Sequence, residues 1–136
     1  MLATVIEGLM DASGPNDSST FSATAAVGAH SHAMRVAERI AVNRTVGGVH
    51  FPADNLCGAL LGIAVGEVLV NILRGANATN TYEIGRAADL DHDFSLKAVY
   101  EALTHGSTTS VTLSANNPQK RQLVTAMWHA ALAERP

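Results

Sequence analysis

Three side chains between Asn43 and Asp54 have the types and spacing of an oxyanion site. Arg44 lies six residues before His50, and Asp54 lies four residues after it. The guanidinium of Arg44 offers a rigid fork of hydrogen-bond donors to an oxyanion. A neutral imidazole can bond a tetrahedral centre through one ring nitrogen, while a carboxylate holds the proton on the other nitrogen. The segment therefore predicts half of a phosphate or vanadate site.

The pattern Arg-x5-His-x3-Asp resembles the last signature block of the superfamily of type 2 phosphatidic acid phosphatases and vanadium-dependent haloperoxidases. The run from Gly47 to Asn55, followed by Gly58 and a long apolar segment, makes the resemblance more specific than three spaced residues. It covers Val36 to Leu73, under a third of the chain. The resemblance implies the all-α fold of the C-terminal portion of such proteins.

The resemblance also implies a role for each of the three residues. His50 would be the nucleophile of an acid phosphatase-like hydrolase, forming a phosphohistidine, or the vanadate ligand of a haloperoxidase. Asp54 would orient His50, and Arg44 would anchor the oxyanion. Vanadate, bound by Arg44 and His50, is the cofactor implied for a haloperoxidase, and a phosphatase would need none. The small molecules implied are a phosphoester, or vanadate and peroxide.

Two earlier blocks of the superfamily are missing from this chain. The block Lys-x6-Arg-Pro would supply two more cations, and the block Pro-Ser-Gly-His would supply the general acid. The only lysines, Lys97 and Lys120, follow His50. We therefore expect the rate of the isolated chain to be lower by several orders of magnitude, down to inactivity, unless a second copy or an upstream segment supplies these groups. The alternative is a non-catalytic helical scaffold or oligomerisation module derived from the same superfamily.

Composition limits the classes of protein to which this chain can belong. A length of 136 residues predicts a single domain, spanning residues 1–136. The net charge of −3 argues against a nucleic-acid partner. The single cysteine, Cys57, excludes an intramolecular disulfide, and its apolar neighbours predict a buried thiol. No signal peptide is visible, so a cytoplasmic location is expected.

Apolar periodicity and helix-ending residues predict a bundle of about five helices. Their expected spans are 2–10, an alanine-rich stretch from Ser22 to near Arg44, 55–74 with Gly75 as its stop, 95–103 and 117–134. The last helix is expected to bury Leu123, Met127, Ala130 and Ala131, with Trp128 at its edge. Residues 76–93 are predicted to be irregular, and 107–116 a short strand or a loop.

Gly58, Gly62 and Gly66 recur every fourth residue and predict a smooth helix face that another backbone can approach closely. Glu67 and Asn71 interrupt the apolar run around them. A buried core helix is therefore favoured over a membrane span.

Two other groups of polar residues have side chains of the types found in functional sites. Asp89, Asp91, His92 and Asp93 have the types of metal ligands, but their spacing lacks the glycine and distal glutamate of a calcium loop. A solvated turn is the better interpretation, and no metal site is predicted. His30 and His32 would be candidates for the missing general acid. They lie two residues apart on an expected helix, which favours surface positions.

Overall fold

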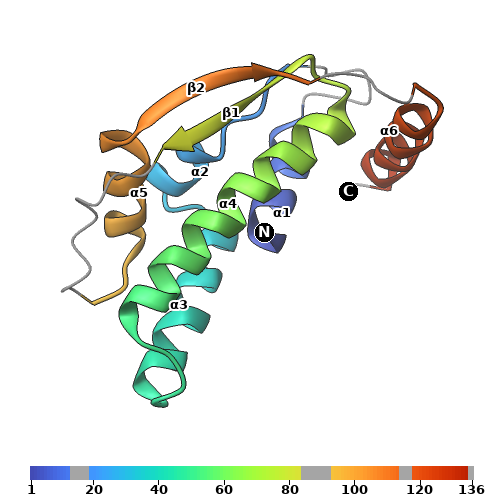
Figure 1. The fold of residues 1–136 in the computed structure, drawn as a ribbon. Coiled ribbons are helices and arrows are strands. Elements are labelled where there is room, and N and C mark those ends of the chain that lie inside the picture. Colours follow the sequence, from blue (N-terminus) through green and yellow to red (C-terminus); the bar gives the residue numbers. More distant parts are fainter. Residues whose placement is uncertain (13–18, 84–92, 114–117, 135–136) are drawn as a thin grey trace.

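The computed structural model describes residues 1–12, 19–83, 93–113 and 118–134, and this part of the chain is mainly helical (Figure 1). The predicted all-α class is therefore confirmed. The described elements, in chain order, are α1 (Leu2–Asp11), α2 (Ala23–Gly28), α3 (His32–Val46), α4 (Pro52–Arg74), β1 (Ala78–Glu83), α5 (Leu96–His105), β2 (Ser107–Thr112) and α6 (Pro118–Ala133).

Helix α4 is the longest element, and the other elements are arranged around it (Figure 1). It begins at Pro52, whose fixed φ and missing N–H suit the first turn of a helix. It ends before Gly75, which has a φ of 75° in the left-handed region that glycine adopts without strain. The predicted stop is confirmed, and the helix starts three residues earlier than the predicted Asn55.

Helix α1 packs closely on α4 because glycines leave room for it. A Cβ atom at Gly66 would lie 2.7 Å from Cβ of Thr4, and one at Gly62 would lie 2.8 Å from the Met1 nitrogen. A Cβ atom at Gly58 would have no neighbour within 4 Å. The predicted close approach is thus confirmed at two of the three glycines, and Gly58 faces open space.

This difference predicts opposite effects for two alanine substitutions on the same helix. Gly66→Ala forces Thr4 and α1 to shift, and we expect a loss of about 1–3 kcal/mol in the free energy of unfolding. Gly58→Ala meets no neighbour, and its higher helix propensity should add up to about 1 kcal/mol. Urea unfolding of both variants measures this. Equal effects of the two substitutions would contradict the α1–α4 packing.

A two-stranded antiparallel sheet joins the segment after α4 to the segment after α5. In its register Ala78 lies opposite Thr112 and Glu83 opposite Ser107. The prediction that residues 76–93 are irregular was therefore wrong for β1, and the strand alternative is confirmed for β2. Both strands, ATNTYE and STTSVT, are rich in threonine, which favours strands, but they lack the apolar alternation that identifies one.

A turn divides the alanine-rich segment into α2 and α3. His30 lies in this turn with a φ of 50°, and its backbone N–H donates to the Val27 carbonyl. The prediction of a helical position for His30 was wrong, whereas His32 begins α3. Helix α3 then continues to Val46, two residues beyond Arg44.

The buried face of α6 also differs from the prediction. Trp128 and Leu132 are buried, whereas Leu123 and Met127 are 65% and 64% exposed. The helix is turned so that its largest side chain, Trp128, joins the core against α4. Its apolar residues are spread around the helix, so their pattern gave the wrong face.

The outward face of α4 is apolar. It carries Cys57, Leu61, Val65 and Leu69 at four-residue intervals, and each is exposed. The prediction of a buried thiol was therefore wrong, because Cys57 lies on this face rather than toward the core. By length and composition α4 could also cross a membrane: an 18-residue window of it has a mean hydropathy of 2.1, and 39% of that window is buried in the fold. The core helix of a soluble protein can have the same length and hydropathy.

Candidate functional site

The turn between α3 and α4 holds Arg44 and His50 on its two sides. Four consecutive backbone N–H groups, from Gly47 to His50, donate to carbonyls of Asn43, Arg44 and Thr45. Gly48 takes a φ of 69°, which lets the chain reverse direction here. The turn therefore caps α3 and leads at once into α4.

The side chains of Arg44 and His50 meet across this turn. Nη2 of Arg44 hydrogen-bonds Nε2 of His50. A guanidinium has only donors, so Nε2 of His50 must accept. This contact corresponds to the tautomer that carries its proton on Nδ1. Arg44 is exposed and His50 is partly buried, so the pair is open to a small anion.

Asp54 makes a different contact from the one that the resemblance implies. Its Oδ2 atom accepts the backbone N–H of Phe51 at 3.2 Å, which caps the start of α4. Asp54 and His50 are both described in the structure, and no hydrogen bond joins them there. The second carboxylate oxygen of Asp54 has the chemistry to accept a hydrogen bond from Nδ1 of His50. The orienting role of Asp54 therefore stays a prediction.

Arg44, His50 and Asp54 all line one pocket of about 370 Å³. The remainder of the lining is mainly apolar and comes from α1, α3, α4, α5 and the segment before α5. These apolar residues include Met34, Ala37, Ile40, Ala41, Ala59, Ile63, Phe94, Leu96 and Val99. Arg44 and His50 thus lie at the border of a mainly apolar cavity, which the carboxylates of Asp54 and Glu38 also line.

No second histidine joins this pocket among the residues described as its lining. His32 lines a separate groove on the outer face of α3, together with Arg35 and Arg39. Over the described ranges, no cluster of three His, Cys, Asp or Glu side chains has the arrangement of a metal site. The segment from Asp89 to His92 lies outside the described residues.

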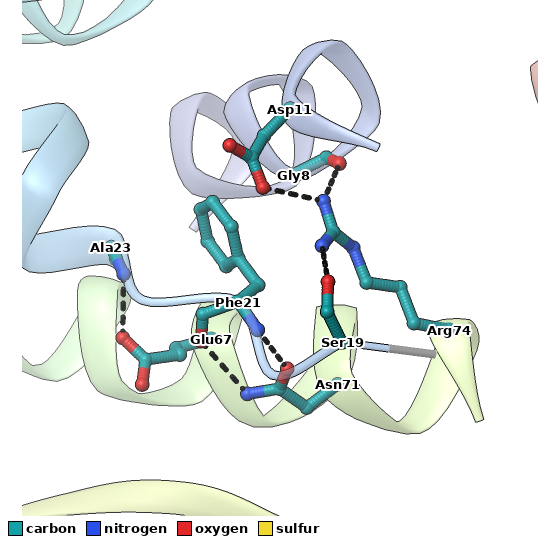
Figure 2. Close-up of polar contacts among 8 residues, drawn as sticks. All are labelled: Gly8, Asp11, Ser19, Phe21, Ala23, Glu67, Asn71 and Arg74. Carbon is teal, nitrogen blue, oxygen red and sulfur yellow. Dashed lines mark hydrogen bonds and ion pairs between the residues drawn. The ribbon is translucent and has the colours of Figure 1, made fainter. Parts of the chain in front are cut away.

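A second polar group lies on the buried face of α4, away from the pocket. Figure 2 shows Glu67, Asn71 and Arg74 projecting from α4 toward α1 and the segment that enters α2. Glu67 is fully buried. Its Oε2 atom accepts the Ala23 N–H at 2.7 Å and the Tyr82 hydroxyl at 2.6 Å, and Oε1 accepts the Asn80 side chain at 2.8 Å. Glu67 therefore caps the first turn of α2 from another helix.

Asn71 and Arg74 extend this group along α4 (Figure 2). Asn71 accepts the Phe21 N–H at 2.7 Å and donates to the Phe21 carbonyl at 3.1 Å. Arg74 donates from Nη2 to the Gly8 carbonyl at 2.6 Å and to Asp11 at 2.9 Å. Its guanidinium also lies 5.3 Å from the centre of the Phe21 ring. These contacts fix α1 and the entry to α2 against α4.

Burial, together with the hydrogen bond to Glu67, raises the pKa of Tyr82 to about 12, from an ordinary value of 10.0. Between these values the unfolded chain has lost the phenol proton and the folded chain keeps it. We therefore expect the stabilising contribution of Tyr82 to be complete below about pH 10 and to be lost as pH rises toward about 12. Urea unfolding measures the free energy of unfolding at about pH 9 and at about pH 11. Its decrease between these two pH values should be smaller for Tyr82→Phe than for wild type. If the decrease for Tyr82→Phe equals those for wild type and for Tyr100→Phe, Tyr82 is not the group whose raised pKa causes it.

Sequence reasoning found the spacing of Arg44 and His50 but missed the role of Glu67 and Asn71. It treated both as interruptions of an apolar run. Their partners are backbone groups 44 and 50 residues away, and no local pattern identifies such partners. Two ionisable or amide side chains one turn apart in an apolar helix are the signal that favours a buried polar network.

Comparisons with protein-family models, curated proteins and solved structures gave no match for this chain.

Proposed function

We propose that this chain is the oxyanion-site module of a histidine-nucleophile phosphoesterase or of a vanadium-dependent haloperoxidase. The observation that carries the proposal is the direct contact between Arg44 and His50 at the border of a pocket. A cation and a neutral imidazole in contact suit a tetrahedral anion: the imidazole bonds the central atom, and the guanidinium binds an equatorial oxygen.

In the phosphoesterase, Nε2 of His50 attacks phosphorus while the bond from phosphorus to the ester oxygen breaks. Because Nε2 accepts a hydrogen bond from Arg44, Arg44 must first transfer this donor to a phosphate oxygen. The leaving alcohol takes its proton from water, since the carboxylates of the pocket, Glu38 and Asp54, already accept the backbone N–H groups of Leu96 and Phe51. Water then hydrolyses the phosphohistidine. The apolar lining favours a substrate with an apolar group beside its phosphate.

Vanadate would use the same two residues in a haloperoxidase. Its fit rests on the donor set: one imidazole nitrogen that is free of a proton, and one guanidinium. When bound, vanadate supplies the activation of peroxide. The chain itself would hold the anion through Arg44 and His50.

The second candidate function is a helical scaffold that docks on another polypeptide. Three apolar side chains around the turn are strongly exposed: Val46 at 82%, Val49 at 65% and Phe51 at 76%. Exposed apolar groups of this size beside a half-site favour a contact that covers them. In this reading the same turn binds a partner, and the isolated chain has no turnover.

Turnover separates the two functions. Hydrolysis of an aryl phosphate, and peroxide-dependent bromination by the vanadate-loaded chain, should be measured for wild type and for His50→Ala. The enzyme proposal expects a low rate that falls to the buffer background in His50→Ala and persists in His105→Ala, since His105 is exposed at the end of α5. Rates shared by wild type and His50→Ala, or absent from both, would reject turnover at His50.

A further inference from the structure

The side-chain amide of Asn55 joins the first turns of α4 to the last turns of α3. Its Nδ2 atom donates to the Ala41 carbonyl at 2.9 Å and to the Thr45 hydroxyl at 2.6 Å. These two acceptors lie one turn apart on α3. One amide on α4 therefore fixes both the distance and the relative register of the two helices next to the site.

The backbone hydrogen bonds of the turn close the connection between the helices, and the side chains around the turn add little packing to it. Beyond Val42, the last residues of α3 are exposed except for the partly buried Thr45. The apolar residues of the turn, Val46, Val49 and Phe51, face solvent and do not pack between the helices. Apolar packing at this end comes from Leu56 of α4 and the partly buried Ala41 and Val42 of α3, and the two hydrogen bonds of Asn55 add a directional link that fixes the register of the two helices.

Arg44 and His50 depend on that spacing because they lie on different sides of the junction. Arg44 precedes Thr45 on α3, and His50 precedes α4 by two residues. Asn55 is partly buried and lines the same pocket as both residues. A shift of α3 along α4 would move the guanidinium away from Nε2 of His50.

We propose that Asn55 is a positioning residue of the oxyanion site, acting through Thr45 and Ala41 to hold Arg44 beside His50. The identity of the ligand, an oxyanion, rests on the proposed function. The role of Asn55 in placing Arg44 beside His50 does not depend on that function. Misplacing a binding group by a fraction of its hydrogen-bond length is enough to weaken a two-point contact with a small anion.

The test combines two measurements on Asn55→Ala. The first is ¹⁵N NMR of the His50 ring, which reports the tautomer that Arg44 selects. The second is calorimetric titration with orthovanadate. We expect Asn55→Ala to move His50 toward a mixture of tautomers and to weaken vanadate binding about tenfold. Asn43→Ala, an exposed asparagine on the same helix end, should change neither.

Substitutions of Thr45 separate positioning from a general loss of stability. Thr45→Val removes one acceptor and should shift the His50 ring signals in the same direction, whereas Thr45→Ser keeps the hydroxyl and should restore them. If Asn55→Ala does not fold, Thr45→Val and Thr45→Ser together still test whether the Asn55–Thr45 hydrogen bond positions Arg44. A His50 tautomer in Asn55→Ala and Thr45→Val identical to that of wild type would overturn the inference. Absence of vanadate binding by wild type would reject the proposed function, and the NMR comparison would still decide the role of Asn55.

Discussion

Glu67→Ala is expected to lower the free energy of unfolding by about 3–5 kcal/mol, close to half the stability of an ordinary small domain. The substitution removes the acceptor of three hydrogen bonds, from Ala23, Tyr82 and Asn80, in a fully buried position. It leaves those donors unsatisfied and opens a cavity, and these costs add. Urea unfolding at neutral pH measures the loss.

Two further variants make the Glu67 result specific. Glu67→Gln keeps the shape but turns one acceptor into a donor, which conflicts with at least one of the three partners, so its cost should be smaller. Glu101→Ala removes an exposed helical glutamate whose ion pair with Lys97 spans 3.8 Å, and it should cost less than about 0.5 kcal/mol. A loss for Glu67→Ala no larger than that for Glu101→Ala would contradict the buried network.

Arg74→Met is expected to cost about 2–3 kcal/mol. Methionine keeps the unbranched stem but leaves the Gly8 carbonyl without the donor that lies 2.6 Å from it, and removes the stacking on Phe21. Most of this cost should come from the buried carbonyl and not from the ion pair. The Arg74 side chain is fully buried, whereas that of Asp11 is 61% exposed and regains water when released. Thermal and urea unfolding measure the change.

Asp11→Asn is the matched control for this interpretation. It weakens the ion pair and leaves the contact between Arg74 and Gly8 in place, so its cost should stay below about 1 kcal/mol. A larger loss for Asp11→Asn than for Arg74→Met would mean that the charge pair, and not the buried donor, fastens α1 to α4.

The parts of the fold that could be predicted from the sequence depend on local signals. Pro52 and Gly75 bound α4 because one fits a first helical turn and the other a left-handed cap. Ser95 starts α5 by accepting the Ala98 N–H at 3.2 Å. Each of these signals acts within a few residues, so no knowledge of tertiary packing is needed to use it.

The parts that were missed depend on contacts between distant segments. The strand β1 is polar, and its pairing with β2 brings together residues about thirty positions apart, such as Ala78 and Thr112. The orientation of α6 follows from Trp128 reaching the core, although an equally apolar stripe lies on its exposed side. A periodic pattern identifies a helix, but it identifies the buried face only where one side is clearly polar.

In the candidate site too, the features set by local sequence could be predicted and those set by tertiary packing could not. Spacing around two glycines was enough to predict that Arg44 and His50 lie on either side of one turn. The capping contact of Asp54 with Phe51 also follows from its position near the start of α4. The apolar pocket and the two hydrogen bonds of Asn55 could not be predicted, because they depend on how α1, α3 and α5 meet α4.

The most direct test of the proposed oxyanion site is calorimetric titration of the purified chain with orthovanadate. The account predicts saturable binding in the micromolar range for wild type and for His105→Ala, and none for His50→Ala. It also predicts strongly weakened binding for Arg44→Ala, since the guanidinium supplies the charged donor. No binding by wild type at millimolar vanadate, or equal binding by wild type and His50→Ala, would contradict the assignment of Arg44 and His50 as an oxyanion site.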